Sequence, residues 1–219
     1  ADCAKLLSNA ISDPDLECEY LARAARRVAD LGDWGDAIGL LAAIDTPTRS
    51  PAVSFVLERL YLATAAWPEL AALRELQIEC GAVDAAGGWF DVGVIARYRL
   101  GHDELAARAF GAAADLSEGA EKALCLREVS ALARGAGRWE VALAADTELL
   151  KFADARGTQR GLLRSSLLQQ LAACHAALGD DASAAEALRC ASVEAEPFIP
   201  AVEAAWRHAN ASGDREMLV

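Results

Sequence analysis

The sequence repeats a short signature at intervals of 34 to 42 residues. Each signature is a glycine followed five residues later by an alanine. Four such pairs occur, and they are Gly32 with Ala37, Gly101 with Ala106, Gly137 with Ala142, and Gly179 with Ala184. Ala66, just before Trp67-Pro68, takes the place of the glycine in a degenerate unit, and Gly213 closes the last unit. A period of this size predicts a solenoid, because one small unit cannot bury its apolar face alone and must stack on the next.

The segments between these marks read as amphipathic helices. Apolar residues recur every three or four positions, and no alternating run indicates a strand. Alanine, the strongest helix former, supplies 51 of the 219 residues. Asp13-Pro14 and Ser50-Pro51 each offer a capping side chain followed by proline at the first helical position. The pattern predicts an all-α fold with helices at 2–11, 15–31, 33–44, 51–66, 69–80, 87–100, 103–116, 120–134, 138–155, 160–178, 181–194 and 199–211.

The signature has a physical explanation. A glycine ends the first helix of a pair by adopting a left-handed conformation with little strain. The alanine five residues later lets the two helices approach closely, since a larger side chain would separate them. Nine residues after the glycine comes a position that fills the layer shared with the next pair, and its occupants are Leu41, Phe110, Asp146 and Leu188. Part of the alanine content is therefore structural.

These features resemble the tetratricopeptide repeat. Trp89-x-x-Val92-Gly93 matches the first-helix element of that family, and Gly101, Ala106, Phe110 and Ala113 complete the unit after one extra residue. Trp34, Trp139 and Pro197 fall at or beside further positions of the family's pattern. The resemblance covers residues 15–213 and implies one domain, residues 1–219, folded as a right-handed α-α superhelix. Its units would be 15–46, 51–80, 87–116, 120–155 and 160–195, five helix pairs in all, with a closing helix at 199–211.

Charge and cysteine content narrow the functional classes. The formal net charge is −12, whereas nucleic acids and anionic membranes attract a basic surface. No stretch is long and apolar enough to span a bilayer. The six cysteines lack Cys-x-x-Cys spacing and fall mostly in apolar helical positions. They are expected to be buried reduced thiols, which favours the cytoplasm; a removed signal peptide would leave a periplasmic or secreted location open.

No motif indicates catalysis or cofactor binding. The three histidines are scattered. Cys174 and His175 are adjacent residues that point about 100° apart on a helix, and they are interpreted as neighbouring core residues. Gly87-Gly88 lacks the lysine and hydroxyl of a phosphate loop and is interpreted as a loop at a helix start. Asp180 and Asp181 are interpreted as helix caps. The sequence thus predicts no catalytic, cofactor or metal site, and a protein that is not an enzyme.

The distribution of arginine supplies a candidate binding site. Of the 21 basic residues, 18 are arginine. The resemblance implies that first helices line a concave groove, whose positions in this chain are Arg26, Val56, Leu60, Arg97, Tyr98, Arg127, Arg134, Gln169 and Arg207. A guanidinium binds both oxygens of a carboxylate. The alternative is a solvated surface of arginines paired with carboxylates one turn away, in a sequence whose arginine and alanine content reflects high-GC coding.

The resulting hypothesis is a non-catalytic interaction module. It would bind a peptide, a partner helix or a protein C-terminus, acidic or carboxylate-bearing, in its groove, with no nucleic acid and no membrane insertion. One alternative is a structural segment of a larger assembly that self-associates through its end helices. Another is a pentatricopeptide-like RNA binder, which the acidic charge and uneven repeat lengths disfavour.

Overall fold

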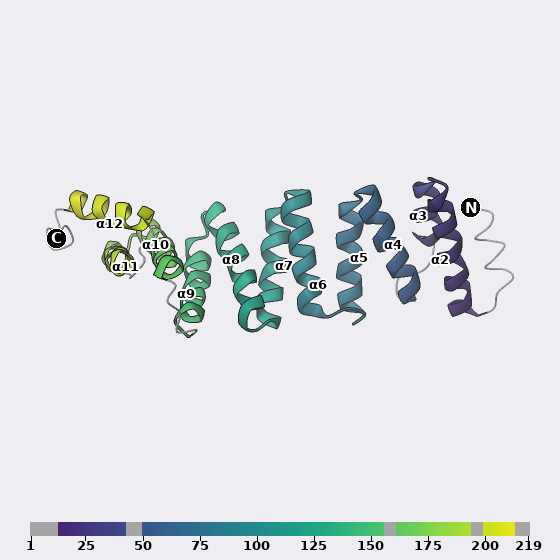
Figure 1. The fold of residues 1–219 in the computed structure, drawn as a ribbon, viewed down its shortest axis with the longest axis horizontal. Helices are drawn as coiled ribbons and strands as arrows, with labels where there is room; N and C mark the ends of the chain where they lie inside the picture. Colours follow the sequence, from purple (N-terminus) through teal and green to yellow (C-terminus); the bar gives the residue numbers. More distant parts are fainter. Residues whose placement is uncertain (1–12, 43–49, 156–160, 194–198, 213–219) are drawn as a thin grey trace. The chain divides into compact units, whose positions relative to one another are not determined.

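Every regular element in the described part of the chain is a helix. The computed structural model describes residues 13–42, 50–155, 161–193 and 199–212. The helices are α2 (Pro14–Asp30), α3 (Trp34–Ala42), α4 (Pro51–Thr64), α5 (Trp67–Glu79), α6 (Ala85–Ile95), η2 (Ala96–Leu100), α7 (Asp103–Leu116), α8 (Gly119–Gly135), α9 (Trp139–Ala155), α10 (Gly161–Ala177), α11 (Asp181–Ser192) and α12 (Ile199–Ser212) (Figure 1). The all-α prediction is confirmed; the helix predicted at 2–11 lies outside the described residues.

The predicted caps begin three of these helices. The Asp13 side chain accepts a hydrogen bond from the Asp15 amide, and Ser50 Oγ accepts one from the Val53 amide at 3.4 Å. Asp180 caps α11 in the same way. Several helix ends lie two residues from their predicted positions, and the start of α5 is one of them. The α5 helix begins at Trp67 rather than 69, because Pro68 occupies the first turn, where its missing N–H costs nothing.

The chain forms two compact units, the first ending at Ala106 and the second beginning at Ala107, within α7. Each unit is described by itself, and the single domain over 1–219 stays a prediction. In the first unit α2 packs on α3 and α4, and α5 packs on α6. Most of its buried apolar residues form one cluster that runs from Cys18 to Ile95, with Leu41, Leu57 and Leu70 among its members.

The second unit is built from the α8–α9 pair, the α10–α11 pair and α12. The α9 helix contacts both α8 and α10, and α12 packs mainly on α11. Its apolar core includes several small clusters, one of which joins Leu168 and Leu171 of α10 to Ala191 of α11. A second cluster joins Ala133, Ala142 and Cys174.

The turns within the pairs follow the predicted chemistry with one change of register. The four signature glycines, Gly32, Gly101, Gly137 and Gly179, all have positive φ. In the degenerate unit the left-handed residue is Ala65, with φ +54°, and not Ala66 as predicted. Ala65 and Ala66 donate backbone hydrogen bonds to Leu62 and Tyr61, in the same pattern that Gly137 and Arg138 make with Arg134 and Ala133.

The alanines of the signature are buried, as predicted. Ala37, Ala106, Ala142 and Ala184 are all at most 1% exposed. The extra residue noted in the third unit is absorbed by the π-helical turn η2, where the His102 amide donates to the Ala96 carbonyl at 2.8 Å. A π turn accommodates one inserted residue without breaking the helix.

Gly87 and Gly88 lie in the first turn of α6, so their prediction as a loop was wrong. The Asp84 side chain caps this helix by accepting from the Gly87 amide at 2.8 Å. A Cβ on Gly88 would lie 2.6 Å from Cγ1 of Ile78. Gly88 is therefore where α6 approaches α5 so closely that a side chain would force Ile78 to shift.

Candidate functional site

Three of the predicted groove residues meet in the first unit. They line a groove of about 360 Å³ between α2 and α4, which we call the Arg26 groove. Its principal lining residues are Arg26, Asp30, Trp34, Val56, Arg59 and Leu60. Val56 and Leu60 are buried and form an apolar floor, while the two guanidinium groups and the indole are exposed. The groove thus combines an apolar surface with two cations.

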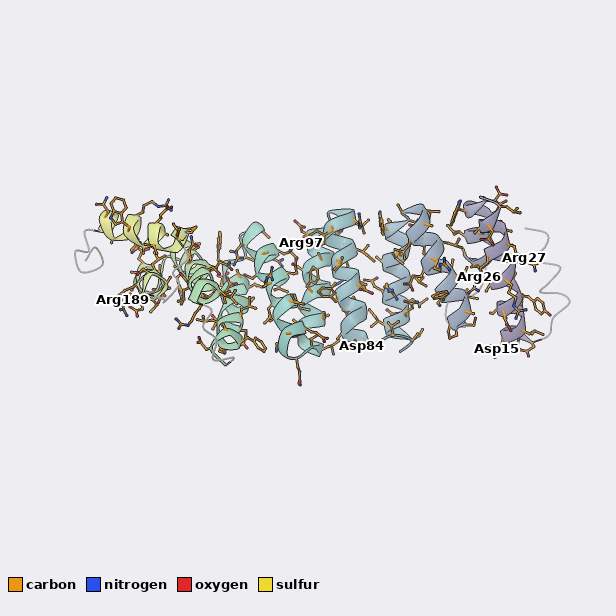
Figure 2. All side chains as sticks on the ribbon, viewed as in Figure 1. Asp15, Arg26, Arg27, Asp84, Arg97 and Arg189 are labelled. Atoms are coloured by element: carbon orange, nitrogen blue, oxygen red, sulfur yellow. The ribbon has the colours of Figure 1, made fainter. Side chains whose placement is uncertain are left out.

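Both arginines of the Arg26 groove are available for a ligand. Arg26 lies on the side of α2 that faces α4, whereas Arg27 lies on the other side (Figure 2). The Arg26 guanidinium stacks over the ring of Phe55 with its Cζ 5.9 Å from the centroid. Within the described residues, neither Arg26 nor Arg59 forms an ion pair. Their hydrogen-bond donors are free to bind an anion.

A second groove lies in the second unit and is lined by residues of α8, α9 and α10. This Leu124 groove has a volume of about 560 Å³, and its principal lining residues are Leu124, Arg127, Leu149, Phe152, Leu163 and Leu167. Apart from Arg127 its surface is mostly apolar. The Arg127 side chain is exposed and has no ion-pair partner among the described residues. This groove offers room for large apolar side chains beside one cation.

Arg134, also predicted to line the groove, is held by a buried carboxylate. Its Nη1 donates to Asp146 Oδ2 at 2.6 Å and to Ser130 Oγ at 2.7 Å. Ser130 Oγ in turn donates to Asp146 Oδ1 at 2.5 Å. The Asp146 side chain is 0% exposed, whereas Arg134 keeps 25% of its side-chain surface. The cluster links α8 to α9 and gives Arg134 a structural partner.

Burial dominates the electrostatics of this cluster. Desolvation raises the pKa of Asp146, although Ser130 and Arg134 act in the opposite direction by stabilising the carboxylate. The thiol of Cys174, on α10, lies 4.0 Å from Asp146 Oδ2. Burial also raises the pKa of Cys174, and the nearby carboxylate adds to that rise. The thiol is therefore a poor nucleophile.

The remaining predicted residues lie at separate places. Arg97 and Tyr98 are in η2, with the Arg97 guanidinium 5.2 Å from the centre of the Tyr98 ring. Gln169 Nε2 donates weakly to the Pro200 carbonyl at 3.4 Å. Arg207 Nε donates to the Glu203 carbonyl of its own helix at 3.3 Å. Arg97 and Tyr98 belong to the first unit but are not among the described lining residues of the Arg26 groove, and Gln169 and Arg207 belong to the second unit.

Several other arginines fit the alternative of a self-paired surface. Arg23 pairs with Glu19 at 2.6 Å, as its spacing predicted. The further pairs are Arg74 with Glu58 and Asp91, Arg164 with Asp154, and Arg189 with Glu186. The self-paired interpretation therefore applies to these arginines, whereas ligand binding by the predicted groove arginines stays a prediction.

Sequence reasoning missed Arg59 and Asp146. Arg59 is three residues after Val56 and one before Leu60, so its place on the same helix was a usable signal. Asp146 stands where other units place leucine or phenylalanine, and a carboxylate at such a position indicates a buried partner. That partner, Arg134, was assigned to the groove instead.

Among the described residues we examined the groups that could bind a metal ion or take part in catalysis. No group of three His, Cys, Asp or Glu side chains among them could hold a metal ion. His102 is exposed and its Nδ1 accepts from the Leu105 amide. His175, predicted as a core residue, is half-buried and lies 3.3 Å from Asp180.

The described residues also bear on two other predictions, those for the cysteines and for membrane-spanning segments. Its five cysteines are free, with Cys18, Cys125 and Cys174 buried and Cys80 exposed, which corrects the expectation for Cys80. Among the helices described, none combines the length and apolar character needed to cross a bilayer.

Comparisons with known proteins address the fold. No protein-family model matches the chain, and no curated protein matches its sequence. Among solved structures, YrrB, described as a TPR protein with an unusual peptide-binding site, is 14% identical, with a TM-score of 0.50 over 92% of this chain and 98% of that one. A putative kinesin light chain with TPR-like repeats from Podosopora anserina is 16% identical (TM-score 0.46; 94% and 100% covered), and MamA is 11% identical (TM-score 0.45; 91% and 95%). With the helix pairs, turns and buried alanines described above, the likeness to YrrB shows that this chain has the all-α helical-repeat fold of the tetratricopeptide-repeat proteins.

Proposed function

We propose that this chain is a non-catalytic protein-interaction module that binds an acidic or carboxylate-bearing segment of a partner protein in the Arg26 groove. The observation that carries the proposal is the pair of exposed guanidinium groups, Arg26 and Arg59, over the apolar floor of Val56 and Leu60; neither has an ion-pair partner in the described part of the chain. An extended peptide would place a carboxylate between the guanidiniums and an apolar side chain on the floor.

The chemistry of the lining favours an anionic peptide over a neutral one. A guanidinium donates two parallel hydrogen bonds to a carboxylate, and such charge-assisted bonds are stronger than neutral ones. Among the described lining residues Asp30 is the one carboxylate, so the two arginines there are in excess. Trp34, at the first position of α3, adds an exposed aromatic surface of the kind enriched at interfaces.

The fold agrees with this proposal without establishing it. Helical-repeat proteins present extended surfaces built from successive units, and such surfaces suit partner segments. YrrB, to which the fold is similar, is a TPR protein with an unusual peptide-binding site. The predicted contributions of Arg97, Tyr98, Arg127, Arg134, Gln169 and Arg207 to partner binding remain part of the proposal, with Arg134 already engaged by Asp146.

Selection from a random peptide library with free C-termini tests the proposal. The enriched peptides are expected to be acidic, and fluorescence anisotropy then gives the affinity of the best one. The double variant Arg26→Glu/Arg59→Glu should weaken that peptide's binding about tenfold or more, and added salt should weaken the wild-type complex.

The matched control is Arg23→Glu/Arg27→Glu. It makes the same charge change on exposed residues of the same first unit, outside the Arg26 groove. The control should bind the peptide within about twofold of wild type, unless binding follows net charge alone. Equal loss in both double variants, or strong salt-dependent retention of random single-stranded RNA, would contradict a specific peptide groove.

A further inference from the structure

The last helix of the second unit presents an apolar ridge to solvent. Ile199, Val202 and Trp206 follow one another at helical spacing on α12 and form what we call the α12 stripe. Ile199 is 71% exposed and Trp206 is 58% exposed. Exposed tryptophan is unusual on a free surface and is enriched at interfaces.

The α12 stripe is not needed for packing within its own unit. The side of α12 that faces the unit carries Ala205 and Ala209, which are both buried. Ala205 joins a cluster with Ala172 of α10 and Leu188 of α11. The helix is thus apolar on two sides, and a helix of that kind normally has partners on both.

The Leu124 groove is the complementary surface on the same chain. Leu124 and Leu163 stand at its two sides and are 49% and 43% exposed, so each has apolar surface left to bury. Phe152 of α9 also lines the groove. The volume of about 560 Å³ is large enough for an indole and a neighbouring aliphatic side chain.

The charges of the two surfaces are also complementary. Glu203 lies next to Val202 and one turn from Ile199 and Trp206, on the exposed side of α12. Arg127 lies beside Leu124 in the lining of the groove. Neither side chain has an ion-pair partner among the described residues. One surface is an apolar ridge with an anion, and the other is an apolar groove with a cation.

We propose that the chain self-associates by docking the α12 stripe of one copy into the Leu124 groove of a second copy. Trp206 would fill the groove between Leu124 and Leu163, and Glu203 would pair with Arg127 of the partner copy. Both halves of a matched contact occur on one chain, which is why the occupant is a second copy. This contact uses none of the Arg26 groove and does not depend on peptide binding there.

Sedimentation equilibrium of the full chain over a wide concentration range tests the proposal. The wild-type chain is expected to form a closed pair or a longer chain of copies, because a closed pair places every stripe in a groove and a longer chain places all but the stripe at its end. Trp206→Glu and Leu124→Glu should each weaken association about thirtyfold or more, as loss of a central apolar contact does. Leu116→Glu, which changes another exposed leucine of the second unit, is the control and should associate as wild type does.

A charge exchange tests whether these two surfaces touch each other. Arg127→Glu alone and Glu203→Arg alone should each self-associate about tenfold more weakly, since each places like charges together. An equimolar mixture of the two variants should recover wild-type association, because every contact between unlike copies again joins a cation to an anion. Circular dichroism should show unchanged helix content in each variant.

Three results would overturn the proposal. They are a wild-type chain that stays monomeric at all concentrations, single charge variants that associate like wild type, and a mixture that fails to recover. Peptide binding at the Arg26 groove should survive Trp206→Glu, so the failure of one proposal is distinguishable from the failure of the other.

Discussion

The two units have different cores although they are built from the same repeat. In the first unit the position nine residues after the turn glycine holds Leu41, which is fully buried in a continuous apolar cluster. In the second unit the same position of the α8–α9 pair holds Asp146, which is also fully buried. The repeat therefore determines whether this position is buried more strictly than it determines whether the residue there is apolar or polar.

The exception is tolerated because α8 supplies the missing partners. Ser130 and Arg134, one turn apart on α8, satisfy both carboxylate oxygens of Asp146. A buried ion pair of this kind seldom adds stability over an apolar pair, yet losing one partner is costly. The second unit should accordingly be sensitive at Arg134 in a way that no arginine pair of the first unit is.

The largest expected effect tests that difference. Arg134→Met should destabilise the chain by about 3–5 kcal/mol at neutral pH, because it leaves a buried carboxylate with Ser130 as its main partner. Urea unfolding followed by circular dichroism measures the loss. Arg74→Met, which removes the partly exposed pair with Glu58 in the first unit, should cost about 1 kcal/mol or less.

The double variant Asp146→Leu/Arg134→Met completes this comparison. It restores to the second unit the residue type that Leu41 supplies in the first, and most of the stability lost in Arg134→Met should return. A double variant as unstable as the single one would show that the cluster has a role beyond pairing charges.

Enlarging a buried alanine of the repeat signature should lower the stability of both units by a similar amount. Ala106→Leu in the first unit and Ala184→Leu in the second should each cost about 1–3 kcal/mol, because both alanines are buried at close helix contacts. Thermal melts provide the measurement. The exposed alanines Ala63 and Ala173 are suitable controls, and leucine there should change stability little. Unchanged melts for both buried variants would contradict the close packing of the pairs.

Substitutions at the left-handed turn residues of the two units should change the stability in opposite directions. Ala65→Gly in the first unit is expected to stabilise by about 0.5–1 kcal/mol, because glycine adopts the left-handed conformation that strains alanine. Gly179→Ala in the second unit should destabilise by about 1 kcal/mol for the same reason. Chemical denaturation of both variants decides the matter, and two changes of equal sign would argue against a shared turn geometry.

The smallest expected effect is a change in pH dependence. The pKa of Asp146 is raised in the folded chain above its ordinary value of 3.8, so the folded state binds a proton more readily than the unfolded state does. Asp146 thus favours folding increasingly as pH falls through its raised pKa and opposes it when ionised. The free energy of unfolding of wild type relative to Asp146→Asn should rise on mild acidification; a fall would mean that Arg134 outweighs burial.

Other carboxylates act in the opposite sense, which is why the difference between variants is the useful quantity. A hydrogen bond from Ser183 lowers the pKa of Asp180, and one from Arg189 lowers the pKa of Glu186. Their contributions are lost as pH falls, and they cancel between wild type and Asp146→Asn.

Most of the fold could be predicted because its determinants are local. Proline-bearing caps, turn glycines and helical periodicity act within a few residues, and the predicted boundaries lie within about two residues of those observed. The errors arose where local rules compete. Gly87 and Gly88 resemble a loop in isolation, yet the cap from Asp84 and the close approach to Ile78 place them in a helix.

The candidate site was less predictable because it depends on contacts between helices. The resemblance placed Arg26, Val56 and Leu60 on one surface, and the structure brings these three together. It could not distinguish Arg26, which has no ion-pair partner among the described residues, from Arg134, whose partner lies twelve residues away on another helix. Which arginines pair and which stay open is decided by the residues opposite them.

The π turn η2 has a consequence for how such a chain tolerates genetic change. A residue inserted into a repeat would rotate every later side chain by about 100° if the helix simply continued, and the buried alanines would turn outward. In η2 the added residue is confined to one wide turn that ends at Gly101, and Ala106 regains its buried position five residues later. The effect of the insertion is thereby confined to the unit where it occurred, and the later units keep the same buried and exposed positions of the repeat.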